Sequence, residues 1–304
     1  MELICQGVWG SYPRPMSAEF AAGLTERCRD PGCGSRDRKP DQDGRPLTYG
    51  GDTSCLEVRL PGDRRLILDA GTGLRKLDCY RSDEELHVLL THLHVDHVAG
   101  LTLCPAVWQR KVRLVLHAMR QPHSSLWSLL NSLYRPPLWP VQLRTVLDRR
   151  DCNEFDADGR PVELDVLPDI VRVRALPVRH TDPTVAYRID TDGASLVFAP
   201  DHEGNADADR FSQFAAGASL LIHDSQYLPE ELPQKEGWGH SSYEQAISVA
   251  SQAGVETLLL WHHDPSRTDR DLDELGRRAE RFAREQTGGR LRVLVAYDGL
   301  QLRL

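Results

Sequence analysis

Hydrophobic and polar residues alternate along several short stretches of the chain, and a period of two is typical of β-strands. In the first half, the predicted strands are residues 1–9, 55–60, 65–68, 86–90 and 112–117. In the second half, they are residues 171–178, 185–189, 195–199, 219–222, 257–261 and 291–296. The turn at Thr191-Asp192-Gly193 predicts that two of the later strands form a hairpin.

Apolar residues at helical spacing occur between these strands. They predict helices over residues 98–108, 241–253 and 269–286. The second of these helices begins at Ser241-Ser242-Tyr243-Glu244, which has the form of a capping box. Because strands and helices recur in both halves, the pattern favours a layered α/β (α+β) fold with helices outside the sheets.

An aromatic and proline-rich segment covers residues 121–140 and includes Trp127, Tyr134 and Trp139. It predicts a helix followed by an extended arm. Such an arm covers a cleft, enters a partner subunit or packs against its own domain, and the sequence leaves these alternatives open. On this basis we expect a homodimer.

The composition of the 304-residue chain, with 40% hydrophobic and 27% charged residues, is typical of a soluble domain. We expect a single domain over residues 1–304. The net charge of -8 argues against a general surface for polyanions, but it allows a small anionic substrate in a local cationic site. The chain shows neither a long apolar run nor the pattern of a signal peptide, so we expect a cytoplasmic protein.

A stretch rich in glycine, proline and charged residues, at about 21–47, predicts an irregular inserted loop. Cys28 and Cys33 lie in it, and they either hold an accessory metal or are two free thiols. The seven cysteines of the chain form no C-x-x-C pair. This scattered, odd-numbered set is typical of reduced thiols in a cytosolic protein.

The strongest chemical signal follows the predicted strand at 86–90. The stretch Thr91-His92-Leu93-His94-Val95-Asp96-His97 contains three imidazoles and a carboxylate. On an extended segment, His92 and His94 project to the same side and can face one ion. Asp96 and His97 come where the chain turns into a helix, so they can face a second ion. Four such side chains in six residues indicate a metal site.

Further donors follow strands in the second half of the chain, where a rigid scaffold can fix their positions. His180 follows the strand at 171–178, and Asp201 follows the strand at 195–199. His240 precedes a helix, and His262-His263-Asp264 follows the strand at 257–261. Asp69, in Asp69-Ala70-Gly71-Thr72-Gly73, either shapes a turn or supports a ligating histidine.

The H-x-H-x-D-H motif with a later His, Asp and His resembles the metallo-β-lactamase fold superfamily, whose fold is an αββα sandwich with a dinuclear metal site. Several stretches also resemble its phosphodiesterase branch, which includes ribonuclease Z, phosphoribosyl cyclic phosphodiesterases and enzymes that degrade cyclic nucleotides. These stretches are Gly50-Gly51-Asp52-Thr53-Ser54-Cys55, Leu68-Asp69-Ala70-Gly71-Thr72-Gly73, Gly239-His240-Ser241-Ser242 and Leu260-Trp261-His262-His263-Asp264-Pro265.

The resemblance implies a set of seven metal ligands, which are His92, His94 and His180 at the first metal, Asp96, His97 and His262 at the second, and Asp201 between them. It implies two divalent ions, with Zn²⁺ expected and Mn²⁺ or Fe²⁺ as alternatives. It also implies that a hydroxide held between the ions attacks phosphorus. His240 would stabilise or protonate the leaving group with Asp224 as its partner, and Asp96 is counted among the catalytic residues. His263 is left as a support or substrate contact.

From these features we expect a phosphodiesterase that acts on a small phosphodiester, such as a cyclic nucleotide or a cyclic ribose phosphate. Alternatives are a ribonuclease Z-like RNA 3′-end endonuclease, an acyl hydrolase of lactamase or thioesterase type, and a nucleotide-binding module without turnover. Three features depart from the branch. Asp52 stands where many relatives have Asn, and the loop at 21–47 is longer than a minimal sandwich requires. The long basic-tipped arm of ribonuclease Z is not identifiable.

Overall fold

The computed structural model describes residues 1–14, 46, 48–77, 84–109, 112–204 and 207–304. Within the predicted inserted loop at 21–47, the structure describes only Pro46, so Cys28 and Cys33 lie outside the described residues. The thiols of Cys5, Cys55, Cys104 and Cys152 are free.

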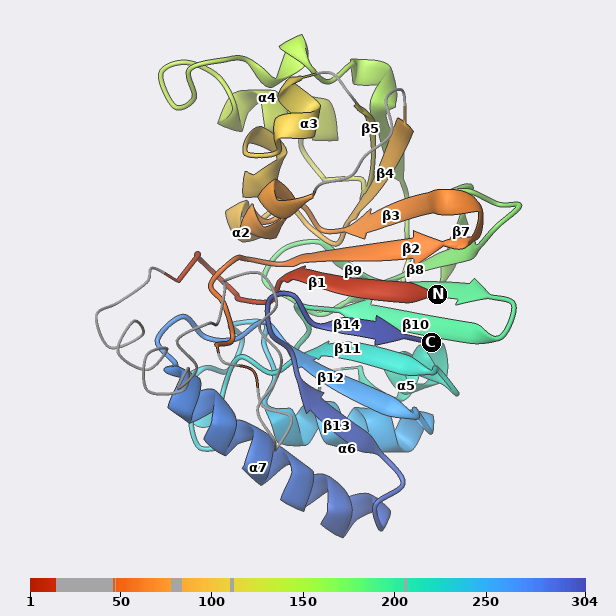
Figure 1. Cartoon of the computed structure of the whole chain (residues 1–304), viewed down its shortest axis with the longest axis vertical. Coiled ribbons are helices and arrows are strands. Elements are labelled where there is room, and N and C mark those ends of the chain that lie inside the picture. The colour runs from red at the N-terminus through yellow and green to blue at the C-terminus, as the bar shows by residue number, and fades with distance from the viewer. Residues whose placement is uncertain (15–45, 47, 78–83, 110–111, 205–206) are drawn as a thin grey trace, which may run out of the picture.

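Two seven-stranded β-sheets pack face to face, and helices cover their outer faces, which confirms the predicted αββα sandwich (Figure 1). The first sheet has the order β14 (Gln301–Arg303), β1 (Glu2–Gly7), β2 (Cys55–Leu60), β3 (Arg64–Leu68), β4 (Glu84–Leu90), β5 (Val112–Met119) and β6 (Cys152–Phe155). The second has the order β13 (Arg292–Val295), β12 (Thr257–Trp261), β11 (Leu220–Asp224), β10 (Ala194–Ala199), β9 (Thr184–Thr191), β8 (Arg172–Val178) and β7 (Val162–Leu164).

The period of two in each strand divides its side chains between two cores. In β3, Leu66 and Leu68 belong to the core between the sheets, whereas Ile67 belongs to the core beneath the helices of the first sheet. Leu89 and Leu90 of β4 divide in the same way. All these side chains are fully buried, so the register of each strand is set by apolar burial on both of its faces.

Helices of the described residues cover the outer face of each sheet (Figure 1). They are α2 (Val95–Val98), α3 (Pro105–Trp108) and α4 (Leu126–Leu133) on the first sheet, and α5 (Ala208–Ala215), α6 (Tyr243–Ala253) and α7 (Asp269–Thr287) on the second. Short 3₁₀ helices are η1 (Pro61–Asp63), η2 (Thr72–Lys76), η3 (Ala99–Thr102), η4 (Leu143–Thr145), η5 (Arg149–Asp151) and η6 (Leu232–Gln234). In the part of the chain that the structure describes, no helix is both long and apolar enough to cross a membrane.

The helix predicted over residues 98–108 is wrong as a single element, because the chain forms α2, η3 and α3 there. Pro105 has no N–H group and starts a new helix after the extended residue Cys104. The capping box of α6 also differs by one residue from the prediction. It joins Ser242 and Gln245, and the hydroxyl of Ser241 instead donates to the carbonyl of His202.

The aromatic segment at 121–140 does not form the extended arm that the sequence predicts. After α4 the chain makes turns that fold back on the same lobe. The Tyr134 hydroxyl donates to the carbonyl of Val98 over 2.7 Å, and the ring centroids of Tyr134 and Trp139 lie 6.2 Å apart. The aromatic rings therefore contribute to the core of their own domain.

Candidate metal centre

The candidate ligands gather where several strands of both sheets end. His92 and His94 follow β4, and His180 follows β8. Asp201 follows β10, and His262 follows β12. Because the ligands come from rigid strand ends of two sheets, the packing of the sandwich sets their spacing.

The first group consists of His92, His94 and His180, whose ligand atoms lie within 4.8 Å of one another. The Nε2 atom of His180 lies 3.3 Å from the Nδ1 atom of His94. The ring centroids of His92 and His180 are 4.9 Å apart. Three imidazole nitrogens at this spacing can surround one metal ion.

The second group consists of Asp96, His97 and His262, which meet the same limit of 4.8 Å. The Oδ2 atom of Asp96 lies 3.3 Å from the Nε2 atom of His97 and 3.3 Å from the Nε2 atom of His262. Asp96 and His97 lie on α2, so one helical turn after β4 brings both of them to this group.

Asp201 lies between the two groups and is 2% exposed. Its Oδ1 atom is 3.2 Å from the Nε2 atom of His262 and 3.7 Å from the Nε2 atom of His180. Its Oδ2 atom is 3.0 Å from the Nε2 atom of His97. The carboxylate therefore contacts ligands of both groups, which is the position that a bridging ligand needs.

Outer hydrogen bonds select the nitrogen that each ring presents to the centre. His97 donates from Nδ1 to Asp69 over 2.7 Å, and His180 donates from Nδ1 to the carbonyl of Gly239 over 2.8 Å, so both present Nε2. His94 is reversed, because its Nε2 donates to Asp182 over 2.8 Å and leaves Nδ1 toward His180. Such partners fix the tautomer and the orientation of a ligating histidine.

Asp69 takes part in this support. Besides the bond from His97, its carboxylate accepts from the backbone N–H and the hydroxyl of Thr91 and from the hydroxyl of Ser54. Asp69 is fully buried and has a φ of 60°. The sequence leaves two roles open for Asp69, and the structure shows the one in which its carboxylate supports a histidine, namely His97.

Several polar atoms in the centre are buried without a hydrogen-bond partner among the described residues. They are the Nε2 atoms of His92 and His97 and the Oδ2 atom of Asp201. Buried polar atoms without partners are rare in folded proteins, since each costs about 1–3 kcal/mol. Two divalent cations would satisfy these atoms, with His92 at one ion, His97 at the other and Asp201 between them, and imidazole and carboxylate donors suit Zn²⁺, Mn²⁺ or Fe²⁺. The residues present therefore fit a pair of metal ions.

The electrostatics of the centre indicate the same need for positive charge. Burial acts to lower the pKa of His97, but Asp201, Asp96 and Asp69 hold that pKa well above its usual value. Burial acts to raise the pKa of Asp201, but His262 and His97 keep it well below its usual value. The buried carboxylates thus require cations beside them, and bound metal ions would supply that charge.

His262 and His263 point to opposite sides of the chain. The backbone N–H groups of both donate to the carbonyl of Val8, and His262 has a φ of 62°. His263 is 1% exposed, donates from Nε2 to the carbonyl of Ala296 and packs edge-on to Trp9. Of the two roles that the sequence left open for His263, these contacts favour support of the fold over contact with a substrate.

His240 adjoins both groups without belonging to either histidine triad. Its Nδ1 donates to the Oδ2 atom of Asp224 over 2.6 Å. Its ring stacks on His262 at 5.0 Å and meets His180 edge-on at 5.0 Å. Burial acts to lower the pKa of His240, but the charge and hydrogen bond of Asp224 raise it to about 9. The Asp224 carboxylate thus favours the charged form of the His240 imidazole.

Residues 64–263 match the beta-lactamase superfamily domain. The chain belongs to the metallo-β-lactamase superfamily. An uncharacterized protein of Mycobacterium tuberculosis (strain ATCC 25618 / H37Rv) is 30% identical over 223 residues, which are 71% of this chain and 76% of that protein. Ribonuclease Z of Mycobacterium bovis (strain BCG / Pasteur 1173P2) is 36% identical over 207 residues, which are 59% of this chain and 67% of that enzyme.

Solved structures of low sequence identity share the metallo-β-lactamase fold. The metallo-β-lactamase fold protein YhfI of Bacillus subtilis has a TM-score of 0.63 and 19% identity and covers 99% of this chain and 98% of its own. The short form of human tRNase Z has a TM-score of 0.61 and 16% identity, and the match covers 100% of this chain and 99% of that chain. Zn²⁺-bound PqqB of Methylobacterium extorquens has a TM-score of 0.60 and 18% identity, with 100% of both chains covered. These solved structures show that the described chain has the fold of these proteins.

Two supporting residues of this metallo-β-lactamase centre were missed from the sequence. Asp182 holds His94, and the side-chain oxygen of Gln226 lies 2.7 Å from the Nδ1 atom of His262. Gln226 follows the end of β11, which is the same strand-end signal that identified Asp201. Asp182 lies in a loop after His180, and the sequence offers no signal for its contact with His94.

Asp52, which replaces the Asn of many relatives, is matched by neighbouring cations. Its carboxylate accepts from Arg75 over 2.9 Å and from the hydroxyl of Thr72 over 2.8 Å, and Lys76 lies 2.8 Å away. Lys76 also contacts Asp298 over 2.8 Å. Asp52 is therefore part of an ion-pair network beside β1 and β2, and among the described residues no histidine of the two ligand groups forms a hydrogen bond with its carboxylate.

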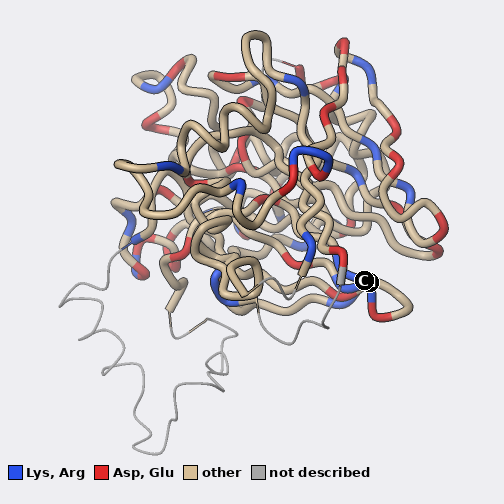
Figure 2. The backbone as a smooth tube through the Cα atoms, turned by 90° about the horizontal axis from the view of Figure 1, so that it is seen from above, with Lys and Arg blue, Asp and Glu red and all other residues tan. Residues whose placement is uncertain are grey.

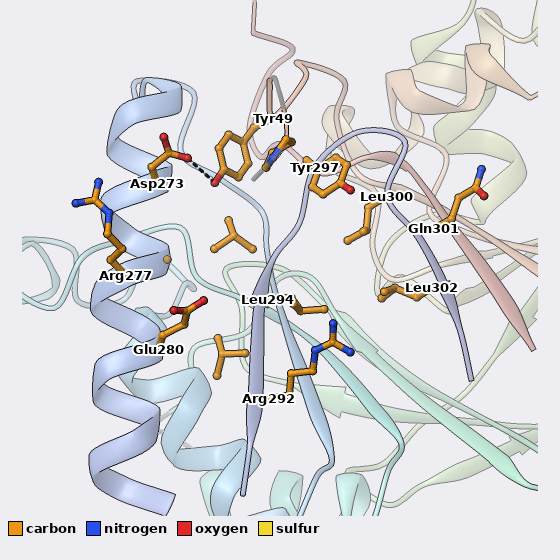
Figure 3. Close-up of a pocket in the computed structure, with 14 residues that line it drawn as sticks. Tyr49, Asp273, Arg277, Glu280, Arg292, Leu294, Tyr297, Leu300, Gln301 and Leu302 are labelled. Carbon is orange, nitrogen blue, oxygen red and sulfur yellow. Dashed lines mark hydrogen bonds between the residues drawn. The ribbon is translucent and has the colours of Figure 1, made fainter. Parts of the chain in front are cut away.

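A separate cavity of about 390 Å³ lies between α7, β13 and β14 (Figure 3). The Tyr49 hydroxyl donates to Asp273 at one end of it over 3.1 Å, and Arg292 and Leu302 lie along its strands. None of the described residues that line the cavity is a histidine or cysteine. The cavity is thus distinct from the metal centre.

Proposed function

We propose that the protein is a metal-dependent phosphodiesterase that hydrolyses a small phosphodiester, namely a cyclic nucleotide or a cyclic ribose phosphate. The observation that carries this proposal is the 2.6 Å contact between His240 and Asp224 beside the two ligand groups. Hydrolysis of a phosphodiester releases an alkoxide that needs a proton, and a charged imidazole next to the centre can donate one.

His92, His94 and His180 would hold the first ion, and Asp96, His97 and His262 the second, with Asp201 between them. Bound ions of this kind lower the pKa of a coordinated water and neutralise charge on phosphate oxygens. We expect Zn²⁺, because five imidazoles and two carboxylates suit it, with Mn²⁺ or Fe²⁺ as alternatives.

Asp224 orients the proton donor. It is fully buried, and its Oδ1 atom accepts from the backbone N–H of Gln226 over 3.0 Å. Its Oδ2 atom also accepts from the N–H of His202 over 3.2 Å. These bonds hold the carboxylate against Nδ1 of His240, so the proton available for transfer is the one on Nε2.

The test is hydrolysis of bis(p-nitrophenyl) phosphate by the metal-loaded protein, together with metal analysis of variants. We expect turnover in the wild-type protein and loss of bound metal in His92→Ala. His240→Ala should lose activity while keeping its metal, and this result would argue against an acyl hydrolase, which has little need of His240. The proposal fails if the loaded protein does not cleave the diester and His92→Ala binds metal as the wild type does.

A ribonuclease Z-like endonuclease is the second candidate, because of the 36% identity to a mycobacterial ribonuclease Z. Figure 2 shows Lys and Arg interspersed with Asp and Glu along the described chain, and the net charge is -8. An enzyme that holds a long polyanion normally carries a basic stripe, so the charge pattern favours a small substrate. Cleavage of precursor transfer RNA on a gel, with no turnover of cyclic nucleotides, would reverse this order.

The homodimer stays a prediction. Leu138 and Val141, at the turns after α4, are 71% and 43% exposed and offer apolar surface for a partner. Sedimentation of the purified protein at micromolar concentration tests the homodimer, and a monomer at that concentration would contradict it.

A further inference from the structure

Trp238 is an exposed aromatic residue two positions before His240. Its side chain is 53% exposed, whereas Trp9 and Trp261 are fully buried. Exposed tryptophan is uncommon in soluble domains, and where it occurs its large flat ring often serves recognition. The position of Trp238 beside the candidate proton donor therefore calls for a functional explanation.

Lys235 lies against the face of this ring. Its Nζ atom is 3.9 Å from the centroid of the Trp238 ring and 5.3 Å from that of Tyr227. Among the described residues, no carboxylate pairs with Lys235. Two aromatic faces thus hold an ammonium group whose charge is not neutralised by an ion pair.

The same residues connect Trp238 to the centre. The Tyr227 ring meets the His240 ring at 90° with 5.6 Å between centroids. On the other side, the carbonyl of Gly239 accepts the hydrogen bond from His180. Gly239 has a φ of 81°, and a Cβ there would lie 2.4 Å from the Nδ1 atom of His180, so only glycine fits. Trp238 therefore precedes the glycine that contacts the centre, and Lys235 and Tyr227 connect its ring to His240.

The chain around Trp238 is held in place at several points. The backbone N–H of Trp238 donates to the carbonyl of Lys235 over 3.1 Å. Upstream, the N–H of Leu228 donates to Glu231 over 2.8 Å, and Arg267 also contacts that carboxylate. The exposed ring is thus presented on a segment with defined contacts, which lowers the entropy that a ligand must overcome.

We propose that Trp238 and Lys235 form a subsite for a nucleobase carried by the leaving group of the phosphodiester. This inference rests on the proposed function, in which His240 serves the leaving oxygen. A base attached to the sugar of that oxygen would reach the ring beside His240 and stack on it. Lys235 supports the indole ring and adds positive charge for the anionic substrate. The subsite selects nucleotides over base-free cyclic ribose phosphates.

Stacking is tolerant of the base, because every base has a flat π face. The subsite should therefore separate nucleotides from sugar phosphates without strong preference among bases. The stacking of one base corresponds to roughly a tenfold to hundredfold change in affinity. This is the size of the selectivity that Trp238 should contribute.

The test compares 3′,5′-cyclic AMP with 1-deoxyribose 3,5-cyclic phosphate, which has the same leaving oxygen but no base. We expect the wild-type kcat/KM to be roughly tenfold to hundredfold higher for the nucleotide. Trp238→Ala should remove most of this ratio, Trp238→Phe should retain part of it, and Lys235→Gln should raise KM for both substrates. Leu138→Ala changes an exposed apolar residue on the other lobe and should leave the ratio as in the wild type.

A binding measurement gives a second readout. Adenosine 5′-monophosphate, the expected product, should quench tryptophan fluorescence in the wild type and much less in Trp238→Phe. If the wild type cleaves both cyclic phosphates with equal kcat/KM, or if Trp238→Ala keeps the full ratio, the subsite is refuted while the phosphodiesterase stands. If the wild type cleaves neither, the proposed function fails, and Trp238-dependent quenching then decides whether the base site exists.

Discussion

The Nδ1 atom of His240 and the Oδ2 atom of Asp224 lie 2.6 Å apart, and Asp224 is fully buried behind the imidazole. Burial alone would lower the pKa of His240, yet Asp224 raises it to about 9. Replacing Asp224 by Asn should therefore remove the negative charge that holds the proton and leave only a neutral amide oxygen as the acceptor for Nδ1. We expect kcat to fall by about 10²- to 10⁴-fold with unchanged metal content. Steady-state kinetics and metal analysis check this, and a loss of metal would contradict the orienting role.

The pH dependence follows from the same pair. Since the folded pKa of His240 is raised to about 9, the imidazole is charged below that pH and loses its proton as the pH rises through it. Activity that needs the proton should persist at pH 7–8 and decline above about 9. The linked contribution to stability has the same sign, being complete below the ordinary pKa of about 6.5 and lost through about 9. In Asp224→Asn the alkaline decline should move to lower pH, and a decline that stays near 9 would assign it to another group.

Asp201 contacts ligands of both groups, so its replacement should weaken both metal sites. A ligand present at a hundredfold excess over its Kd stabilises the folded state by about 2.7 kcal/mol. We expect added Zn²⁺ to raise the unfolding free energy of the metal-free wild type by an amount of this order, and to do much less for Asp201→Asn. Thermal unfolding with and without metal measures it. Equal stabilisation of both proteins would show that Asp201 is not a ligand.

Gly10 leaves the space that His262 occupies. A Cβ on Gly10 would lie 2.3 Å from the Cε1 and Nδ1 atoms of His262. Gly10→Ala should displace that imidazole and lower the bound metal from about two ions toward one, with the fold retained. Gly276→Ala in α7 is a matched control, because its Cβ would meet only a methyl group of Val295 at 3.1 Å. Metal analysis and circular dichroism separate the outcomes, and two bound ions in Gly10→Ala would contradict the assignment of His262.

The substitution Asp52→Asn tests whether the ion-pair network beside the centre stabilises the fold. Burial acts to raise its pKa, but the hydrogen bond from Arg75 and the charge of Lys76 lower it below its usual value. The network therefore stabilises the fold above the ordinary pKa of about 3.9 and loses this contribution as the pH falls through the lower folded value. Asp52→Asn should cost about 1–3 kcal/mol in urea unfolding at pH 7 and less at pH 3. A cost independent of pH would mean that charge is not the cause.

The sequence predicted most strands, because β-strands buried on both faces show runs such as Leu66-Ile67-Leu68 that depend little on distant contacts. It missed β6, β7 and β14, which are short strands at the sheet edges, and α5. The prediction of one helix over 98–108 was wrong because it relied on the helical spacing of apolar residues and did not place a break at Pro105.

For the metal centre, the position of polar residues after strands predicted the ligands. In the structure, the ligand atoms of each group lie within 4.8 Å of one another. The supports Asp182 and Gly239 could not be predicted in the same way. Asp182 acts through a side-chain contact across 88 positions, and Gly239 through a backbone carbonyl. Neither contact leaves a periodic pattern or a motif, because each depends on where two loops meet in space.

The ligands are divided between the two halves of the sandwich, and this has a consequence for assembly. His92, His94, Asp96 and His97 belong to the part of the chain before β6, whereas His180, Asp201 and His262 belong to the part after β7. A chain cut in the exposed turn at Asp158 would leave each fragment with an incomplete set of donors. Neither fragment alone could bind both ions tightly, so metal would drive the two fragments to reassociate, and cooperative uptake of zinc would report the rejoining of the sheets.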